Sequence, residues 1–131
     1  MLPERISAII IENKKLLLVT GYEEKFYWTP GGKIEGKESH EKCLKRELLD
    51  ELGIKLIKMK HYATLNLINE IKKENQINHY YIVEYTGKIK PKNEITKFIW
   101  YSKTNFLDKK PRVSKGIETD LIPRLLGDNF L

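Results

Sequence analysis

Residues 32–54 read GKIEGKESHEKCLKRELLDELGI, and this stretch carries the strongest structural signal in the chain. From Ser39 to Leu52, leucines recur at helical spacing, which predicts a helix with one apolar face. Serine is common at helix starts, and Gly53 is well placed to end the helix. The preceding Thr29-Pro30-Gly31-Gly32 should interrupt any regular element. The stretch therefore predicts a loop followed by a secure helix.

Three carboxylates, those of Glu47, Asp50 and Glu51, stand at positions i, i+3 and i+4 of this helix. This spacing places them on one face within about one turn. Like charges so spaced cost an isolated helix roughly 0.2 to 0.5 kcal/mol per pair, and a bound cation would relieve the repulsion. Hard divalent ions, Mg²⁺ above all, prefer such oxygen ligands. The alternative is an acidic face that is simply solvated.

The residues ahead of the helix complete such a site. Gly31 and Gly32 allow the backbone to approach a metal ion or a phosphate closely, and the Gly31 carbonyl could add a ligand. Glu38 lies eight residues before Arg46 and could pair with it, fixing the loop against the helix. We interpret that ion pair as scaffold rather than as catalyst.

Taken together, the segment resembles the Nudix box. That family pattern is Gly, five residues, Glu, seven residues, Arg-Glu, an aliphatic residue, any residue, Glu-Glu, any residue, Gly and an aliphatic residue. It is matched at the same spacing by Gly32, Glu38, Arg46, Glu47, Leu48, Glu51, Gly53 and Ile54. Asp50 replaces the first glutamate of the Glu-Glu pair. Its shorter side chain favours metal contact through water.

The resemblance implies an α/β fold, a Nudix-like α/β/α sandwich with a mixed β-sheet between helices. It implies Glu47 and Glu51 as the core Mg²⁺ ligands, with the Gly31 carbonyl and Asp50 as helpers, and Mn²⁺ could substitute. In this family a glutamate in a later loop often joins the metal site or acts as general base, and Glu94 is the best match. An ordinary loop glutamate is the alternative for that residue.

The remaining elements follow from apolar patterning and turn residues. We expect strands over 4–12 and 15–20 joined as a hairpin by Asn13-Lys14, and further strands over 54–67, 79–85 and 97–101. Residues 21–25, 69–78 and 87–94 are expected to be loops. Helical spacing recurs over 114–126, although Pro123 should disturb a helix there.

The chain has 131 residues and 40% apolar content, which suits a single domain over residues 1–131. No apolar run approaches the roughly 20 residues that cross a bilayer, and the first residues lack the pattern of a secretory signal. We therefore expect a soluble cytoplasmic protein without membrane contact. Its one cysteine, Cys43, excludes an internal disulfide.

The net charge of +6, from 24 basic and 18 acidic residues, would help to attract a polyanion. Only four basic residues are arginines, and they are scattered, which disfavours a nucleic-acid partner. A lysine-rich surface that maintains solubility explains the charge better. The sequence leaves the oligomeric state open, with a homodimer as one assembly.

The chemistry we expect is hydrolysis of a phosphoanhydride bond in a nucleotide substrate. Metal-bound phosphate would be attacked by water, with Glu51 or Glu94 as base and Glu47 as a further catalytic carboxylate. Lys25 and Lys33 are candidates for phosphate binding, whereas Tyr27 and Trp28, with Phe26, could stack on a base. Solvated lysines and core aromatic residues are the alternatives.

The substrate is predicted by elimination. Stretch 69–73 lacks the proline and the tyrosine that mark ADP-ribose and diadenosine-polyphosphate members of the family. We therefore favour a nucleoside triphosphate, including oxidised or otherwise modified ones, split into a monophosphate and pyrophosphate. Dinucleoside polyphosphates, ADP-ribose, nucleotide sugars and capped RNA ends remain alternatives, as does a catalytically silent nucleotide-binding module.

Overall fold

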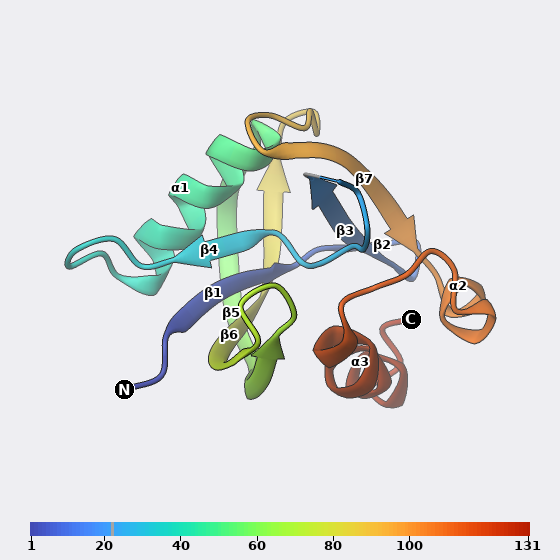
Figure 1. Ribbon diagram of the computed structural model, residues 1–131. Coiled ribbons are helices and arrows are strands. Elements are labelled where there is room, and N and C mark those ends of the chain that lie inside the picture. The colour runs from blue at the N-terminus through green and yellow to red at the C-terminus, as the bar shows by residue number, and fades with distance from the viewer. Residues whose placement is uncertain (22) are drawn as a thin grey trace.

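The computed structural model describes residues 1–21 and 23–131. Its strands are β1 (Glu4–Ile9), β2 (Ile11–Glu12), β3 (Lys15–Gly21), β4 (Gly31–Lys33), β5 (Lys55–Asn69), β6 (Glu74–Thr86) and β7 (Ile95–Tyr101). Its helical segments are α1 (His40–Leu52), α2 (Lys103–Asp108), the π-helical turn η1 (Ile117–Leu121) and α3 (Ile122–Gly127). Figure 1 shows α1 and α3 on opposite sides of the strands.

The strands form two sheets. One sheet has the order β4-β1-β6-β5 and is mixed, because β1 runs parallel to β6 and antiparallel to β4. The other has the order β2-β3-β7 and is antiparallel throughout. The predicted α/β class with a mixed sheet between helices is confirmed, with the strands divided between two sheets.

Alternate residues of the strands pack into two cores. Ile6 and Ala8 of β1 pack with Leu48 of α1, whereas Ile9 belongs to the cluster that holds Leu121 of η1. This period of two is what a sheet covered on both faces requires. Burying a leucine-sized side chain stabilises a fold by about 1.5 to 3 kcal/mol, so both helices are held mainly by apolar contacts.

The predicted hairpin forms where it was expected. Asn13 and Lys14 connect β2 to β3 with φ angles of 51° and 59°. Two consecutive left-handed residues suit the right-handed twist of a hairpin. The expected strand 4–12 is divided at Ile10, however, and its first part, β1, joins the mixed sheet.

Helix α1 begins and ends at the predicted residues. The Ser39 hydroxyl accepts a hydrogen bond from the Lys42 N–H at 3.1 Å. Gly53 takes the left-handed conformation at φ 67°, and its N–H reaches the carbonyls of Leu48 and Leu49. Both ends therefore have partners for backbone groups that a helix leaves free.

Two loop predictions are wrong. The expected loop 69–78 is only the turn 70–73, because β6 begins at Glu74 and pairs with Asn69 of β5. Polar composition suggested a loop, but the β5–β6 ladder pairs this backbone whatever the side chains are. Likewise, Gly31 and Gly32 do not interrupt the structure but begin β4, paired with β1. Of the expected loop 21–25, Tyr22 lies outside the described residues.

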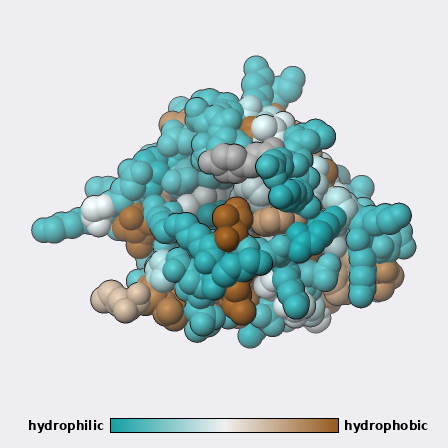
Figure 2. All heavy atoms as spheres, viewed as in Figure 1, coloured by the Kyte–Doolittle hydropathy of each residue, from teal (hydrophilic) through white to brown (hydrophobic). Residues whose placement is uncertain are grey.

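The C-terminal segment is helical, as predicted, but in two parts. The π-helical turn η1 leads into α3, and Pro123 lies in the first turn of α3, where a missing N–H costs least. The short helix α2, capped by Ser102 and Asn105, was not predicted. No helix in the described part of the chain could span a membrane. The face in Figure 2 is mostly hydrophilic, with apolar side chains in separate spots.

Candidate functional site

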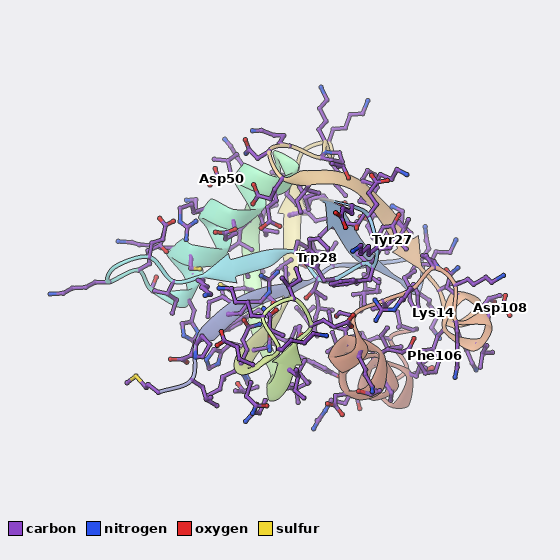
Figure 3. The ribbon with its side chains drawn as sticks, in the orientation of Figure 1. Lys14, Tyr27, Trp28, Asp50, Phe106 and Asp108 are labelled. Atoms are coloured by element: carbon purple, nitrogen blue, oxygen red, sulfur yellow. The ribbon has the colours of Figure 1, made fainter. Side chains whose placement is uncertain are left out.

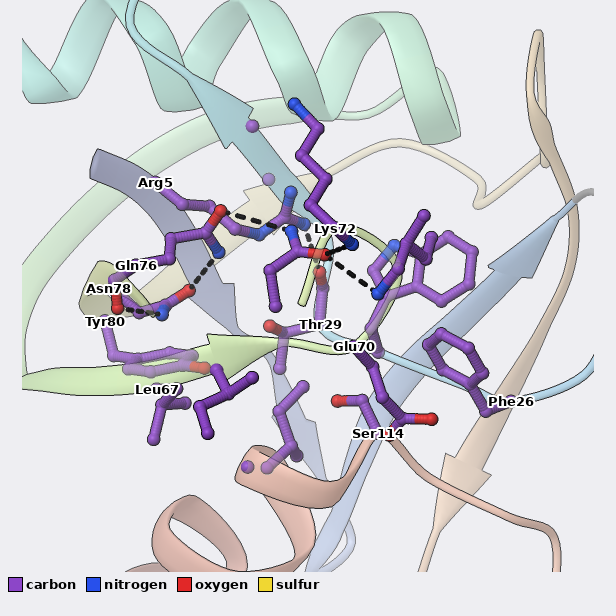
Figure 4. A pocket seen from close by; sticks show the side chains of 18 of the residues that line it. Arg5, Phe26, Thr29, Leu67, Glu70, Lys72, Gln76, Asn78, Tyr80 and Ser114 are labelled. Carbon is purple, nitrogen blue, oxygen red and sulfur yellow. Dashed lines mark hydrogen bonds between the residues drawn. The ribbon is translucent and has the colours of Figure 1, made fainter. Parts of the chain in front are cut away.

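A cavity of about 510 Å³ opens beside α1, within the range of small-molecule sites. Its walls come from α1, η1 and the strands β1, β4, β5, β6 and β7, together with the segments before β4, β7 and η1 and the β5–β6 turn (Figure 4). Segments far apart in the sequence therefore meet around one volume. The acidic residues of α1 lie at one part of this wall, and polar residues of β6 form another.

Glu47 and Glu51 bring two carboxylates to the cavity from successive turns of α1. The Glu51 side chain is almost fully buried and accepts a hydrogen bond from the Gly31 N–H at 3.3 Å. Gly32 approaches Glu47 so closely that a β-carbon on it would lie 2.5 Å from Glu47 Cδ. Glycine at these two positions therefore lets β4 run close to the backbone of β1 at Gly31 and close to the Glu47 carboxylate at Gly32.

Burial raises the pKa of Glu51 to about 9, and the neighbouring Glu47 carboxylate adds to the rise. The charge of Arg5 and the Gly31 N–H oppose it. Two carboxylates in contact inside a protein cannot both stay ionised at low cost. A proton or a cation must therefore accompany Glu51, in addition to the Arg46 guanidinium that contacts Glu47.

Arg46 fixes the glycine-rich loop to the helix, as the sequence predicts. Its Nε and Nη2 atoms donate to the two Glu38 oxygens at 2.7 and 2.8 Å. Its Nη2 also donates to the Lys33 carbonyl at 3.1 Å, and its Nη1 reaches Glu47 Oε1 at 2.5 Å. Arg46 thus orients the Glu47 carboxylate while it ties down the loop.

The other two carboxylates predicted as metal ligands differ in whether they line the cavity. Glu94, just before β7, lines the cavity together with Glu47 and Glu51. Asp50 is exposed, does not line the cavity, and lies on the outer side of α1 (Figure 3). Across residues 1–21 and 23–131, no three acidic, histidine or cysteine side chains converge closely enough to hold a metal ion by themselves.

Some of the predicted substrate-binding residues line the cavity and others do not. Trp28 lines the cavity, as does Phe26, and their rings meet edge to face at 5.7 Å. Tyr27, between them, does not line the cavity and packs against the buried cluster that contains Val113, the residue with which it forms a β-bridge. Lys25 is exposed and pairs with Glu23 at 2.7 Å.

Lys33 is exposed and does not line the cavity itself. Its ammonium group lies close to that of Lys72, which does line it, and the proximity of Lys72 lowers the pKa of Lys33. The charge of Glu74 opposes this lowering of the Lys33 pKa only in part.

Sequence reasoning missed a set of polar residues in the cavity wall, namely Arg5, Thr29, Glu70, Lys72, Gln76, Asn78 and Tyr80. Arg5 donates to the Thr29 carbonyl at 2.8 Å. Gln76, Asn78 and Tyr80 alternate along β6, but the polar composition of residues 69–78 led to the assignment of the first two to a loop.

Comparison with known sequences places these features among related proteins. A family profile described as NUDIX domain matches residues 1–121. The chain is 35% identical over 65 residues to an 8-oxo-dGTP diphosphatase of Buchnera aphidicola subsp. Acyrthosiphon pisum (strain APS), an alignment that covers 49% of this chain and 52% of that protein. The match thus spans about half the length of this curated relative.

Solved structures share the fold over nearly the whole chain. The E. coli ORF135 protein is similar with a TM-score of 0.76 and 24% identity, covering 97% of this chain and 92% of that one. A MutT NUDIX hydrolase from Burkholderia pseudomallei is similar with a TM-score of 0.73 and 21% identity, covering 88% and 92%. At these identities the likeness concerns the fold alone.

Proposed function

The chain belongs to the NUDIX family, and from this premise we propose that it is a divalent-metal-dependent nucleotide pyrophosphohydrolase. Its substrate is a nucleoside triphosphate, modified ones included, which it splits into a monophosphate and pyrophosphate. The observation that carries the proposal is the Glu47 and Glu51 pair at the wall of a nucleotide-sized cavity. The similarity of half the chain to an 8-oxo-dGTP diphosphatase supports this substrate class.

The residues present fit a hard divalent cation. Glu47, which contacts Arg46, and the buried Glu51 offer two neighbouring carboxylates, and Glu94 lines the same cavity. Mg²⁺ is commonly held by one or two carboxylates, with phosphates and water as its other ligands, so a closed cage of protein ligands is not required. Mn²⁺ suits the same ligands. Asp50 could contribute only from outside the cavity wall.

When bound, such an ion neutralises phosphate oxygens and lowers the pKa of a water molecule. The chain's own groups position the reaction. Arg46 orients Glu47, and the Gly31 N–H orients Glu51. A carboxylate beside the phosphates then accepts the proton of the attacking water. Glu51 and Glu94 are the two candidates, because both line the cavity.

The test is a hydrolysis assay on the intact protein with Mg²⁺ and a substrate panel. The panel contains the standard nucleoside triphosphates, 8-oxo-dGTP, a dinucleoside polyphosphate, ADP-ribose, a nucleotide sugar and capped RNA. We expect metal-dependent release of pyrophosphate, rather than orthophosphate, from at least one triphosphate. Turnover of only the other substrates would contradict the substrate class. Absence of any turnover would favour the silent nucleotide-binding module.

We also propose that residues 1–131 form one domain. The family profile ends at residue 121, but Leu125 and Leu131 are buried in the same cluster as Leu16 and Leu18 of β3. A homodimer and a cytoplasmic location stay predictions. Light scattering and cell fractionation would test them.

A further inference from the structure

One face of β6 carries polar side chains into the cavity. Gln76, Asn78 and Tyr80 alternate along the strand, and they are 7%, 4% and 1% exposed. All three line the cavity (Figure 4). Strand β6 is an inner strand, between β1 and β5. Its inward face would ordinarily be apolar, as it is on β5, where Leu65 and Leu67 are buried.

Burying a carboxamide is unfavourable unless its polar atoms find partners. Asn69 Nδ2 donates to Gln76 Oε1 at 3.3 Å, and Gln76 Nε2 donates to Asn78 Oδ1 at 3.3 Å. Asn78 Nδ2 donates to the Gln76 carbonyl at 3.2 Å. A carboxamide has two N–H groups and two acceptor lone pairs. Within the described part of the chain, both amides therefore keep one donor and one acceptor beside the cavity.

This chemistry selects among the parts of a nucleotide. Phosphate oxygens at neutral pH are acceptors only, so they would leave the amide oxygens without partners. A nucleobase edge on which an exocyclic amino or keto group stands next to a ring nitrogen offers a donor and an acceptor together. Asparagine and glutamine recognise such edges in other complexes. Phe26 and Trp28 add aromatic surface to the same cavity, suitable for stacking on a ring.

We infer that Gln76 and Asn78 read the substituted ring edge of the nucleobase and so determine the base specificity of the enzyme. The inference rests on the proposed function, because it assumes a nucleotide whose phosphates lie at Glu47 and Glu51. The carboxamides act in recognition and leave the hydrolysis itself unchanged. The two carboxamides should therefore change the ratio of kcat/KM between substrates, and not the rate at which all substrates are hydrolysed.

The test compares bases with and without the exocyclic group. The substrates are ATP and GTP against purine riboside triphosphate, and CTP and UTP against 2-pyrimidinone riboside triphosphate. For the wild-type protein we expect kcat/KM to favour at least one substituted base over its unsubstituted analogue by roughly tenfold or more. Asn78→Leu and Gln76→Met, which keep the approximate volume, should reduce that ratio to within about twofold. The unsubstituted analogue should react at nearly the wild-type rate.

His79→Gln is the matched control. His79 is the neighbour of Asn78 on β6, does not line the cavity, and contacts Glu4 on the other face. It should keep the wild-type ratio. Asn78→Asp covers the case in which the apolar variants fail to fold, because it retains shape and replaces the amide donors with a carboxylate that only accepts; it too should lower the ratio.

Several results would overturn the inference. The first is a wild-type protein that hydrolyses substituted and unsubstituted bases equally, and the second is a set of variants that slow all substrates by one factor. The third, seen with the 2′-deoxy forms of the same substrates, is a set of variants that alter only the preference for ribose or deoxyribose. The last would assign the amides to the sugar. If the wild-type protein hydrolysed no nucleotide at all, the proposed function itself would fail, and the two failures are thus distinguishable.

Discussion

The α-carbon of Gly32 faces the carboxylate of Glu47 so closely that a β-carbon would lie 2.5 Å from Cδ and within 2.7 Å of both oxygens. Real β-carbons essentially never approach another heavy atom this closely. The φ angle of Gly32 is not positive, so a larger residue here would meet no backbone strain but would require the Glu47 side chain to move.

Gly32→Ala should therefore displace Glu47 and leave the fold intact. A displacement of about 1 Å in a catalytic group can cost on the order of 100-fold in rate, and we expect at least a tenfold loss of kcat/KM. Gly127→Ala is the control, because nothing lies within 4 Å of the added carbon. It should retain full activity. Wild-type activity of Gly32→Ala would show that the contact does not position Glu47.

Glu51→Gln tests the buried carboxylate directly. Losing the group should lower kcat by roughly 100-fold or more, because the proposed function makes Glu51 a metal ligand and one of the two candidate bases. Circular dichroism should show a folded protein, since glutamine fits the same space and can still accept from the Gly31 N–H. Undiminished turnover at saturating substrate with Mg²⁺ would reject the assignment.

The same residue predicts how stability of the metal-free protein depends on pH. The pKa of Glu51 is about 9 in the folded chain, against an ordinary value of 4.5. Below pH 4.5 both states hold the proton. As pH rises toward 9, only the unfolded state releases it, so the folded protein loses stability across this window. In EDTA, the melting temperature should fall more steeply with rising pH for the wild type than for Glu51→Gln. Parallel plots of melting temperature against pH would contradict the raised pKa.

The stability that Glu38 contributes depends on pH in the opposite sense. Its hydrogen bonds with Arg46, together with the Glu35 N–H, hold the pKa of Glu38 at about 2, below its ordinary 4.5. Its ion pair therefore stabilises the fold above pH 4.5, and this contribution is lost as pH falls through 2. Glu38→Gln should unfold at lower urea concentration than the wild type at pH 7, and the two should converge in acid.

Glu35→Gln is the matched control, because the Glu35 side chain is 72% exposed and its contact with Arg46 is 3.6 Å long. Exposed pairs of this kind contribute little. Its urea midpoint should stay near that of the wild type at every pH. If the difference in urea midpoint between Glu38→Gln and the wild type did not change with pH, the ion pair would not be the source of that difference.

Local features were predictable from sequence. The helix α1, its caps at Ser39 and Gly53, and the Glu38 to Arg46 pair all depend on residues close in the chain. Asp50 shows where helical spacing misleads. At about 100° per residue, Asp50 and Glu51 lie on different sides of Glu47. A cavity that takes Glu47 and Glu51 therefore leaves Asp50 outside.

The far wall of the cavity could not be predicted in the same way. Gln76 and Asn78 reach it because β6 pairs with both β1 and β5, and strand pairing over such distances leaves no local pattern. The polar composition of the segment suggested a loop instead. Which of Phe26, Tyr27 and Trp28 face the cavity likewise depended on how their segment meets the residues near Val113.

Lys72 should contribute to phosphate binding. It lines the cavity, and its ammonium group lies close enough to Lys33 to lower the pKa of Lys33. An anion near both would relieve the repulsion, so Lys72→Ala should raise KM for the triphosphate by roughly threefold or more, with kcat nearly unchanged. The effect should shrink as salt screens the charges. Lys73→Gln, an exposed neighbour outside the cavity wall, should leave KM unchanged, and an equal effect in both would refute a specific role.

Glu70 ties the β5–β6 turn across the cavity to the segment before η1. Its carboxylate accepts from Arg112 Nη2 at 2.5 Å and from the Lys115 N–H at 2.7 Å, while Arg112 also stacks on Phe26. Glu70→Gln should weaken the charged contact and loosen the turn, which carries two exposed trypsin sites at Lys72 and Lys73.

We expect trypsin to cut at those two sites faster in Glu70→Gln than in the wild type, as followed by mass spectrometry, with cleavage elsewhere unchanged. The substitution neither adds nor removes a trypsin site, so the comparison reports on opening of the turn alone. If the turn closes over bound nucleotide, a non-hydrolysable triphosphate should slow cleavage in both proteins. Equal cleavage of the two free proteins would mean that the turn is held by the β5–β6 ladder, and that the Glu70 to Arg112 contact adds nothing to its closure.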